Sequence, residues 1–391
     1  MAKTKKTKTV KTRKTVSNNL SKKLFLLILS CFFISGLTGL IYEILWTRMI
    51  VKIIGGAPFA VSIVLTVFMG GLGLGSYLAG RSIDRIKDPL QLIRLYGLLE
   101  LGIGAYGLII PVLLIFFSPI YAFIYNHLFH YFLSYNLLTF AGCIILLIIP
   151  VTFMGATLPI LSRFFITTIS RVGTHVGRLY GLNTIGAAAG ALLCGFWLIY
   201  QFGVWGTLVF AIILNVIIGV VCIAVSRRLK NRGKISESVS EVDTGSGEMD
   251  APESMTSDES ERKRFYALVI FCVSGFCAMA YEVIWAKLLG LIVGPTTYSF
   301  TIVLVTFITG LALGSIFFGR LGDRVKNVFM LLLFTQVAAA LFALIFSQLM
   351  GNSQIFFAKL IYQFKDNFVL LSLVKASALF IFMFFPTFCL G

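Results

Sequence analysis

The sequence predicts an all-α polytopic membrane protein, and three observations support this fold class. Hydrophobic residues make up 58% of the 391 residues and charged residues only 13%, whereas soluble domains carry about 25% charged residues. The apolar residues are gathered in long uninterrupted blocks, and about 20 apolar residues in a helix cross the hydrocarbon core of a bilayer. Apolar blocks of this length favour helices, because the backbone inside a membrane must satisfy its own hydrogen bonds. A large part of the sequence is also repeated.

The apolar blocks predict about ten transmembrane helices, at 24–46, 58–80, 92–117, 137–162, 179–201, 204–226, 265–287, 297–319, 327–349 and 368–391. Basic residues cluster after the second, fourth and sixth spans, and residues 1–23 contain nine Lys or Arg and no acidic residue. By the positive-inside rule the N-terminus is cytoplasmic, and we expect the protein in a bacterial inner membrane with the lipid bilayer as its main partner.

Four regions follow from these patterns. Residues 1–23 form a basic arm without an apolar face, which we expect to be disordered and cytoplasmic. Residues 24–226 form a first membrane repeat of six helices, and residues 265–391 a second membrane repeat. The polar, acidic stretch 227–264 between them predicts a disordered cytoplasmic linker. Within the first repeat, residues 118–136 are too polar to span, so we expect an interfacial helix on the outer face.

The repeat is the most informative feature of the sequence. Shifting the chain by 239 positions makes 20 of the 51 residues in 35–85 identical. The shift aligns Ser35-Gly36 with Ser274-Gly275, Tyr42-Glu43 with Tyr281-Glu282, Trp46 with Trp285, Gly71 with Gly310 and Gly75 with Gly314. Beyond residue 87 the register becomes 236, which pairs Glu100 with Gln336 and Gly155 with Gly391. An even number of spans separates the copies, so they are parallel, as in major facilitator transporters.

The second copy stops at a position equivalent to Gly155, in the fourth helix of the first copy. We therefore expect the second repeat to be truncated after four helices, and the chain to be a fragment.

Small residues recur four apart in the second and eighth spans. They are Gly71/Gly75, Ser76/Gly80, Gly310/Gly314 and Ser315/Gly319. This spacing predicts close helix packing. We expect Trp46 and Trp285 to anchor their helices at the membrane–water interface, with ligand binding as the alternative. The cysteines lie within apolar blocks and show no metal-ligand spacing with histidine, so no metal site is predicted.

Glu43 and Glu282 are the strongest candidates for a functional site. A carboxyl group within a span is costly in free energy, so its presence there indicates a functional role. A pseudo-twofold axis would place the two symmetrically, together with Tyr42 and Tyr281, as a cradle for a dication or polycation. The alternative is a structural ion pair with Arg48 or Lys287. Glu100 is a weaker candidate for substrate binding, because Gln336 takes its place in the second copy.

The loop after an even-numbered span carries a Gly-Arg-x2-Asp-Arg sequence in both copies. Its charged residues are Arg81, Asp84, Arg85, Arg320, Asp323 and Arg324. The pattern resembles the signature loop of major facilitator transporters, where it acts as a conformational latch. The alternative is an ordinary positive-inside loop.

Two motifs together resemble a known family. They are Ser-Gly-x5-Tyr-Glu-x2-Trp and Phe-x2-Gly-Leu-x-Leu-Gly-Ser-x3-Gly-Arg-x2-Asp-Arg, and segments 152–159 and 180–190 add to them. They are similar to the membrane part of the fused major-facilitator/spermidine synthase proteins. The resemblance implies a soluble aminopropyltransferase-like domain after the helices, but no position in this chain matches its catalytic or cofactor-binding residues, so no cofactor is expected here.

Three functions remain open. The first is a transporter-like module that handles a polyamine or another small organic cation. The second is the membrane tether of a spermidine synthase-type enzyme whose catalytic domain lies beyond residue 391. The third is a scaffold that transports nothing. Nucleic acid is not an expected partner, since a basic segment beside a membrane helix indicates which side of the membrane that segment lies on.

Overall fold

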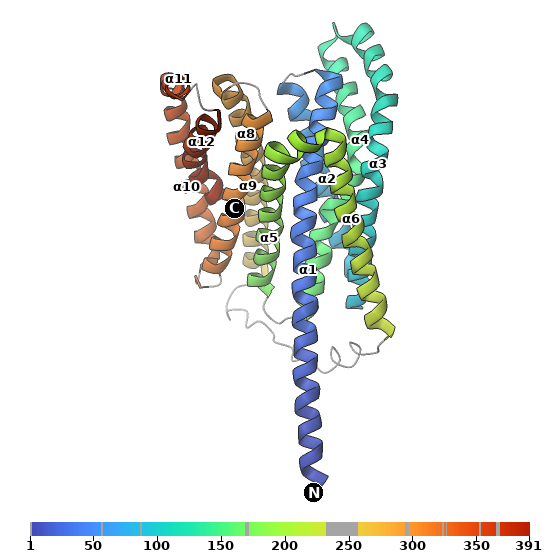
Figure 1. The fold of residues 1–391 in the computed structure, drawn as a ribbon. Helices are drawn as coiled ribbons and strands as arrows, with labels where there is room; N and C mark the ends of the chain where they lie inside the picture. The colour runs from blue at the N-terminus through green and yellow to red at the C-terminus, as the bar shows by residue number, and fades with distance from the viewer. Residues whose placement is uncertain are drawn as a thin grey trace.

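The computed structural model describes residues 2–55, 58–86, 88–168, 172–231, 257–293, 297–322, 324–325, 327–351, 353–364 and 368–391. In this part of the chain every regular element is a helix, and eight stretches are long and apolar enough to cross a membrane. The prediction of an all-α, integral, multi-pass membrane protein is therefore confirmed. The helices run side by side along one direction (Figure 1).

We call the helices up to residue 231 the first bundle and those from residue 257 the second bundle. The first bundle contains α1 (Ala2–Ile54), α2 (Pro58–Ile83), α3 (Pro89–Leu128), α4 (Phe132–Thr168), α5 (Val172–Leu193), a short π-helix (Cys194–Leu198) and α6 (Ile199–Asn231). The second bundle contains α8 (Ser257–Val293), α9 (Thr297–Gly322), α10 (Val328–Gly351), α11 (Ser353–Gln363) and α12 (Phe368–Leu390).

Two of the predicted spans lie in one continuous apolar stretch, Leu179–Asn231. The chain turns inside this stretch at Gly203, where φ is 67° and ψ is −175°. This region of backbone space is nearly restricted to glycine. Because of the turn, α6 returns along the first bundle instead of extending α5 (Figure 1). The last predicted span is α12, in which a shorter apolar helix covers Ser377–Leu390.

The polar regions differ from the sequence predictions. Helix α1 begins at Ala2 and so includes the arm that we expected to be disordered; the arm lacks Gly and Pro, and a span that has already nucleated a helix can extend it. Most of the predicted linker, residues 232–256, lies outside the described residues.

The predicted interfacial helix in 118–136 is also absent. Instead α3 continues to Leu128 and α4 begins at Phe132, so the segment lengthens two spanning helices. A separate short helix, α11, occurs at the corresponding place in the second bundle, where the sequence predicted none.

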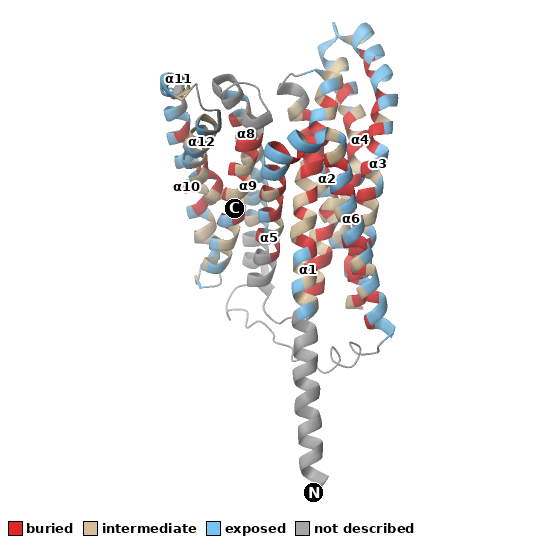
Figure 2. Cartoon of the chain, viewed as in Figure 1, coloured by how far each residue is buried: buried red, intermediate tan, exposed pale blue. Residues whose placement is uncertain are grey.

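Helix α5 joins the two bundles. In the first bundle α1 packs on α5, α2 on α4, and α3 on both α4 and α6. In the second bundle α12 packs on α9 and α10. Helix α5 also packs on α9, and it lies between α1 and the second bundle in Figure 1. Buried residues are concentrated in the interior of the first bundle (Figure 2), where two apolar clusters form its core.

Glycines permit the same close helix contacts in both bundles. A side chain on Gly75 would collide with the backbone of α4, and one on Gly314 with the backbone of α12. The contact of Gly75 with Thr152 is equivalent to that of Gly314 with Phe388. In the same way, the contact of Gly155 with Leu72 is equivalent to that of Gly391 with Leu311. Close packing is thus confirmed for these glycines, but a Cβ added to Gly80 or Gly319 would meet no atom within 4 Å. For these two positions the packing prediction is wrong.

Candidate functional site

Glu43 and Glu282 are brought together although 239 residues separate them. Glu43 lies in α1 and Glu282 in α8, and their side chains are only 3% and 5% exposed. An electrostatic interaction between Glu282 and Glu43 indicates that the two carboxyl groups lie in the same region of the molecule. Within the described part of the chain neither carboxyl group has a hydrogen bond or an ion pair. The arrangement is a buried acidic pair at the boundary between the bundles.

An ion pair with the nearby basic residue does not form in either copy. Among the described residues no salt bridge involves Arg48 or Lys287, and both side chains are exposed. Residues five apart in a helix point about 140° away from each other. Arg48 therefore lies on a different side of α1 from Glu43, and Lys287 is related to Glu282 in the same way.

A stacked aromatic pair flanks each glutamate. The rings of Tyr42 and Trp46 are 5.0 Å apart with an interplanar angle of 25°. The rings of Tyr281 and Trp285 are 5.2 Å apart with an angle of 14°. A spacing of four residues places both rings on one helix face, so the repeated Tyr-Glu-x2-Trp sequence produces the same local geometry twice.

Both tryptophans are buried instead of lying at a membrane interface. Trp46 is 0% exposed and Trp285 is 3% exposed, so the prediction of interfacial anchors is wrong. The sequence pattern could not reveal this, because other helices cover the two sites. The Tyr42 hydroxyl and the Trp46 Nε1 are buried without a hydrogen-bond partner within the described chain, and such groups are usually satisfied. The Tyr42 hydroxyl lies against α3, 3.3 Å from the position that a Cβ on Gly107 would take.

Glu100 belongs to a separate polar cluster inside the first bundle. The Ser35 hydroxyl donates to Glu100 Oε1 at 2.5 Å, and Asn215 Nδ2 donates to Glu100 Oε2 at 2.7 Å. These contacts connect α1, α3 and α6, and Glu100 is 0% exposed. Since both carboxylate oxygens accept hydrogen bonds within the bundle, the structure places Glu100 apart from the pair formed by Glu43 and Glu282. Sequence reasoning missed Asn215; a lone polar residue in an apolar span was its only signal.

The predicted latch residues lie at the ends of their helices. Asp84 forms an ion pair with Arg163 at 4.0 Å, which connects the end of α2 to α4 within the first bundle. Arg81 Nη1 donates to the Tyr77 hydroxyl at 3.3 Å. Arg85 is exposed. In the second bundle Arg320 and Arg324 are exposed, and Asp323 lies outside the described residues.

Comparisons of the chain with protein-family models, with curated proteins and with solved structures find no match in any of the three. In the described part of the chain no three His, Cys, Asp or Glu side chains are grouped so as to hold a metal ion. The buried acidic pair and its aromatic neighbours are therefore the features on which a function can be argued.

Proposed function

We propose that the chain is a transporter-like membrane module in which Glu43 and Glu282 bind a small organic cation with two or more positive charges, such as a polyamine. The observation that carries the proposal is the burial of two neighbouring carboxyl groups without a positively charged partner in the described part of the chain. Two like charges in a site of low dielectric constant are strongly unfavourable. A proton or a bound cation must compensate for them.

The residues around the acidic pair suit an alkylammonium ligand. Two carboxylates can each accept hydrogen bonds from one end of a diamine. The stacked pairs Tyr42–Trp46 and Tyr281–Trp285 lie on the same helices as the two glutamates, and the negative face of an aromatic ring attracts ammonium groups.

The proposal includes two parallel, major-facilitator-like repeats, with about ten transmembrane helices in all and the N-terminus in the cytoplasm. The equivalent glycine contacts of α2 with α4 and of α9 with α12 support this arrangement. The two Tyr–Trp stacks support it too. In parallel-repeat transporters the substrate site lies between the repeats, which is where the acidic pair lies. Movement of the bundles about α5 and α9 would open the buried site to each side in turn.

The test is equilibrium binding of radiolabelled spermidine and putrescine to the full chain in lipid nanodiscs. Hydrogen bonds to charged groups are worth about 1.5–3 kcal/mol, so Glu43→Gln and Glu282→Gln should each weaken binding roughly 10- to 100-fold. In addition, putrescine should bind the unmodified chain more tightly than butylamine does, and either variant should reduce this preference.

Asp88→Asn is the matched control, because it also converts a carboxylate to a carboxamide. Asp88 caps α3 by accepting a hydrogen bond from the Leu90 N–H at 2.9 Å, and asparagine caps helices equally well. Binding by this variant should equal that of the unmodified chain. If both glutamate variants also bind normally, the acidic pair is not the site, and a scaffold or tether function gains support.

A further inference from the structure

Glu100 is a buried carboxyl group without a positively charged neighbour among the described residues. It is 0% exposed, and its hydrogen bonds come from the neutral Ser35 hydroxyl and the neutral Asn215 carboxamide. The other side chains that interact with it electrostatically are phenols and thiols, which are neutral at pH 7; they are Tyr42, Tyr96, Cys31 and Cys222. An ionised carboxylate in such surroundings is strongly unfavourable, so a bound cation or a proton must balance its charge.

Two further oxygen atoms beside Glu100 are buried and unsatisfied. Asn215 Oδ1 and the Tyr96 hydroxyl have no hydrogen-bond partner within the described chain, and the two residues are 1% and 0% exposed. The carboxamide of Asn215 is bound to Glu100 through its nitrogen, and Tyr96 lies one turn before Glu100 on the same face of α3. The Tyr96 hydroxyl interacts with Ser35 and Glu100 but is not in hydrogen-bonding geometry with either. Buried polar atoms are usually satisfied, so these two oxygens point to a ligand that binds oxygen lone pairs.

The composition of this cluster suits a small monovalent cation. Its oxygen atoms come from one carboxylate, one carboxamide and two hydroxyl groups, and oxygen ligands prefer hard cations. Ca²⁺ and Mg²⁺ carry two positive charges, which a single carboxylate does not balance. A proton would connect only one pair of oxygen atoms, so either Asn215 Oδ1 or the Tyr96 hydroxyl would stay unsatisfied. A metal cation can be contacted by all of them at once.

Close helix packing around the cluster favours Na⁺ over the larger K⁺. Gly97 and Gly104 lie one turn before and one turn after Glu100 on the face of α3 that meets α6. A Cβ on Gly97 would lie 2.9 Å from the Gly219 carbonyl oxygen, and a Cβ on Gly104 would lie 3.3 Å from the Cβ of Asn215. The space between α3 and α6 is therefore narrow at both ends of the cluster.

We infer that Glu100, Ser35, Asn215 and Tyr96 form a binding site for Na⁺ inside the first bundle. The carboxylate would supply the negative charge, and the other three side chains would supply neutral oxygen ligands from α1, α6 and α3.

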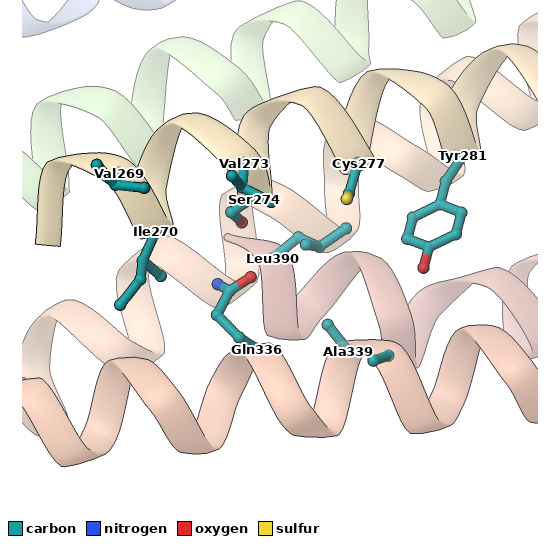
Figure 3. A pocket seen from close by; sticks show the side chains of 10 residues that line it. Val269, Ile270, Val273, Ser274, Cys277, Tyr281, Gln336, Ala339 and Leu390 are labelled. Carbon is teal, nitrogen blue, oxygen red and sulfur yellow. The ribbon is translucent and has the colours of Figure 1, made fainter. Parts of the chain in front are cut away.

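The second bundle does not repeat this site. Ser274 corresponds to Ser35, but Gln336 takes the place of Glu100, and Leu332 takes the place of Tyr96. Ser274 and Gln336 line a pocket of about 270 Å³ among α8, α10 and the end of α12, and Figure 3 shows the Gln336 side chain extending toward Ser274. Without the carboxylate and the phenol, these residues carry no negative charge and fewer oxygen ligands, so the inference concerns the first bundle alone.

The experiment is equilibrium binding of radiolabelled Na⁺ to the full chain in lipid nanodiscs, with choline as the balancing cation. Glu100→Gln should weaken Na⁺ binding roughly 100-fold or more, because it removes the opposite charge next to the ion in a site of low dielectric constant. Tyr96→Phe should weaken it by a smaller factor, because it removes one neutral ligand. The matched controls are Asp88→Asn, at the N-cap of α3, and Tyr106→Phe, about 120° around α3 from Glu100. Both should bind Na⁺ as the unmodified chain does.

A second measurement needs no variant. Na⁺ at about ten times its dissociation constant should raise the unfolding temperature of the unmodified chain by about 3–6 °C relative to choline, and K⁺ at the same concentration should raise it less. An equal effect of K⁺ would overturn the inference. So would the absence of saturable Na⁺ binding, or normal binding by Glu100→Gln.

Two further outcomes would also overturn it. Na⁺ binding that only Glu43→Gln reduces would place the ion at the acidic pair. An infrared band of a protonated carboxyl group that disappears in Glu100→Gln, but is unchanged by Na⁺, would show that a proton balances the charge. The binding test for spermidine and putrescine stands separately, because neither Glu43 nor Glu282 is among the ligands of this site.

Discussion

Helices α1 and α8 carry the same Ser-Gly and Tyr-Glu-x2-Trp residues, yet their surroundings differ. Helix α1 is covered by α5 and α6, whereas α8 leaves most of its surface open. The local geometry of the Tyr–Trp pair is nonetheless the same in both. The same ring stack thus forms in two different surroundings, whereas the contacts of the glycine and the serine depend on which helices pack beside them.

The same contrast applies to the polar positions on α3 and α10. Glu100 has both carboxylate oxygens bound by Ser35 and Asn215. Gln336 faces a pocket. A carboxylate is tolerated deep in the first bundle because α6 supplies a donor, and a neutral amide stands where no such donor is provided by the described residues. Four pairs of substitutions test how far this contrast between the bundles extends.

The largest effect is expected at the paired glycines. Gly36→Val should place a branched side chain against the backbone of Asn183, which cannot move without separating α1 from α5. Overpacking usually costs about 1–3 kcal/mol and more where backbone must shift, so we expect at least 3 kcal/mol here. Gly275→Val should change stability by less than about 0.5 kcal/mol. Thermal unfolding of the full chain in detergent, followed by tryptophan fluorescence, checks both. Equal losses would mean that α8 is also covered.

The next effect concerns the polar positions. Glu100→Leu removes the acceptor of the half-buried Ser35 hydroxyl and of the buried Asn215 amide, and a buried group left without its partner costs about 1–3 kcal/mol. We expect a loss of about 2 kcal/mol in the free energy of unfolding, because membrane hydrogen bonds tend toward the low end. Gln336→Leu should be nearly neutral in the purified chain. A large loss for Gln336→Leu with none for Glu100→Leu would contradict the assigned contacts.

These two contrasts mark the limit of what the sequence could predict. The apolar blocks give the helices directly, because membrane-spanning length is a property of the chain. The repeat aligns Glu43 with Glu282 in the sequence. The partner of Glu100, in contrast, depends on which side of α6 faces the bundle interior, and the sequence of an almost wholly apolar helix does not indicate that side. The burial of Trp46 and Trp285 was missed for a related reason, since it depends on neighbouring helices.

The lengths of α3 and α4 illustrate a different limit. Polar and aromatic residues in 118–136 indicate the edge of a membrane but not whether the chain bends there. In the structure α3 and α4 form one extended hairpin. Near its turn the Tyr121 hydroxyl lies 2.6 Å from the Tyr135 hydroxyl and donates to the Ile54 carbonyl at 3.0 Å. Contacts of this kind join residues from different helices, so a pattern that follows the chain alone does not reveal them and favours the shorter helices wrongly.

A smaller effect is expected at Gly203, the turn that lets α6 cover the first bundle. Its backbone conformation is strained for any residue with a side chain, by about 1–3 kcal/mol. There is space for an added Cβ, so Gly203→Ala should cost about 1–2 kcal/mol through the backbone alone. Gly39→Ala, in the middle of α1, is a suitable control because a Cβ there also meets no atom. It should be neutral or slightly stabilising. Urea or heat unfolding of both variants gives the comparison, and a neutral Gly203→Ala would show that the turn adopts another conformation.

The smallest effect on stability is expected at Asp84, and its value lies in separating a latch from a structural contact. The ion pair with Arg163 is 4.0 Å long and Asp84 is 74% exposed, and pairs of this kind contribute about 0–1 kcal/mol. Asp84→Asn should therefore lower the unfolding temperature by no more than about 4 °C, given that 1 kcal/mol shifts a large protein by about 2–4 °C. If the repeated Asp-Arg loops act as latches in a transporter, the same variant should still bind spermidine normally but should slow its uptake into proteoliposomes. Asp323→Asn should do the same from the second bundle. Normal uptake by both variants would show that the loops act only as positively charged segments that set the membrane topology. A large loss of stability would show instead that the ion pair between Asp84 and Arg163 holds α2 against α4.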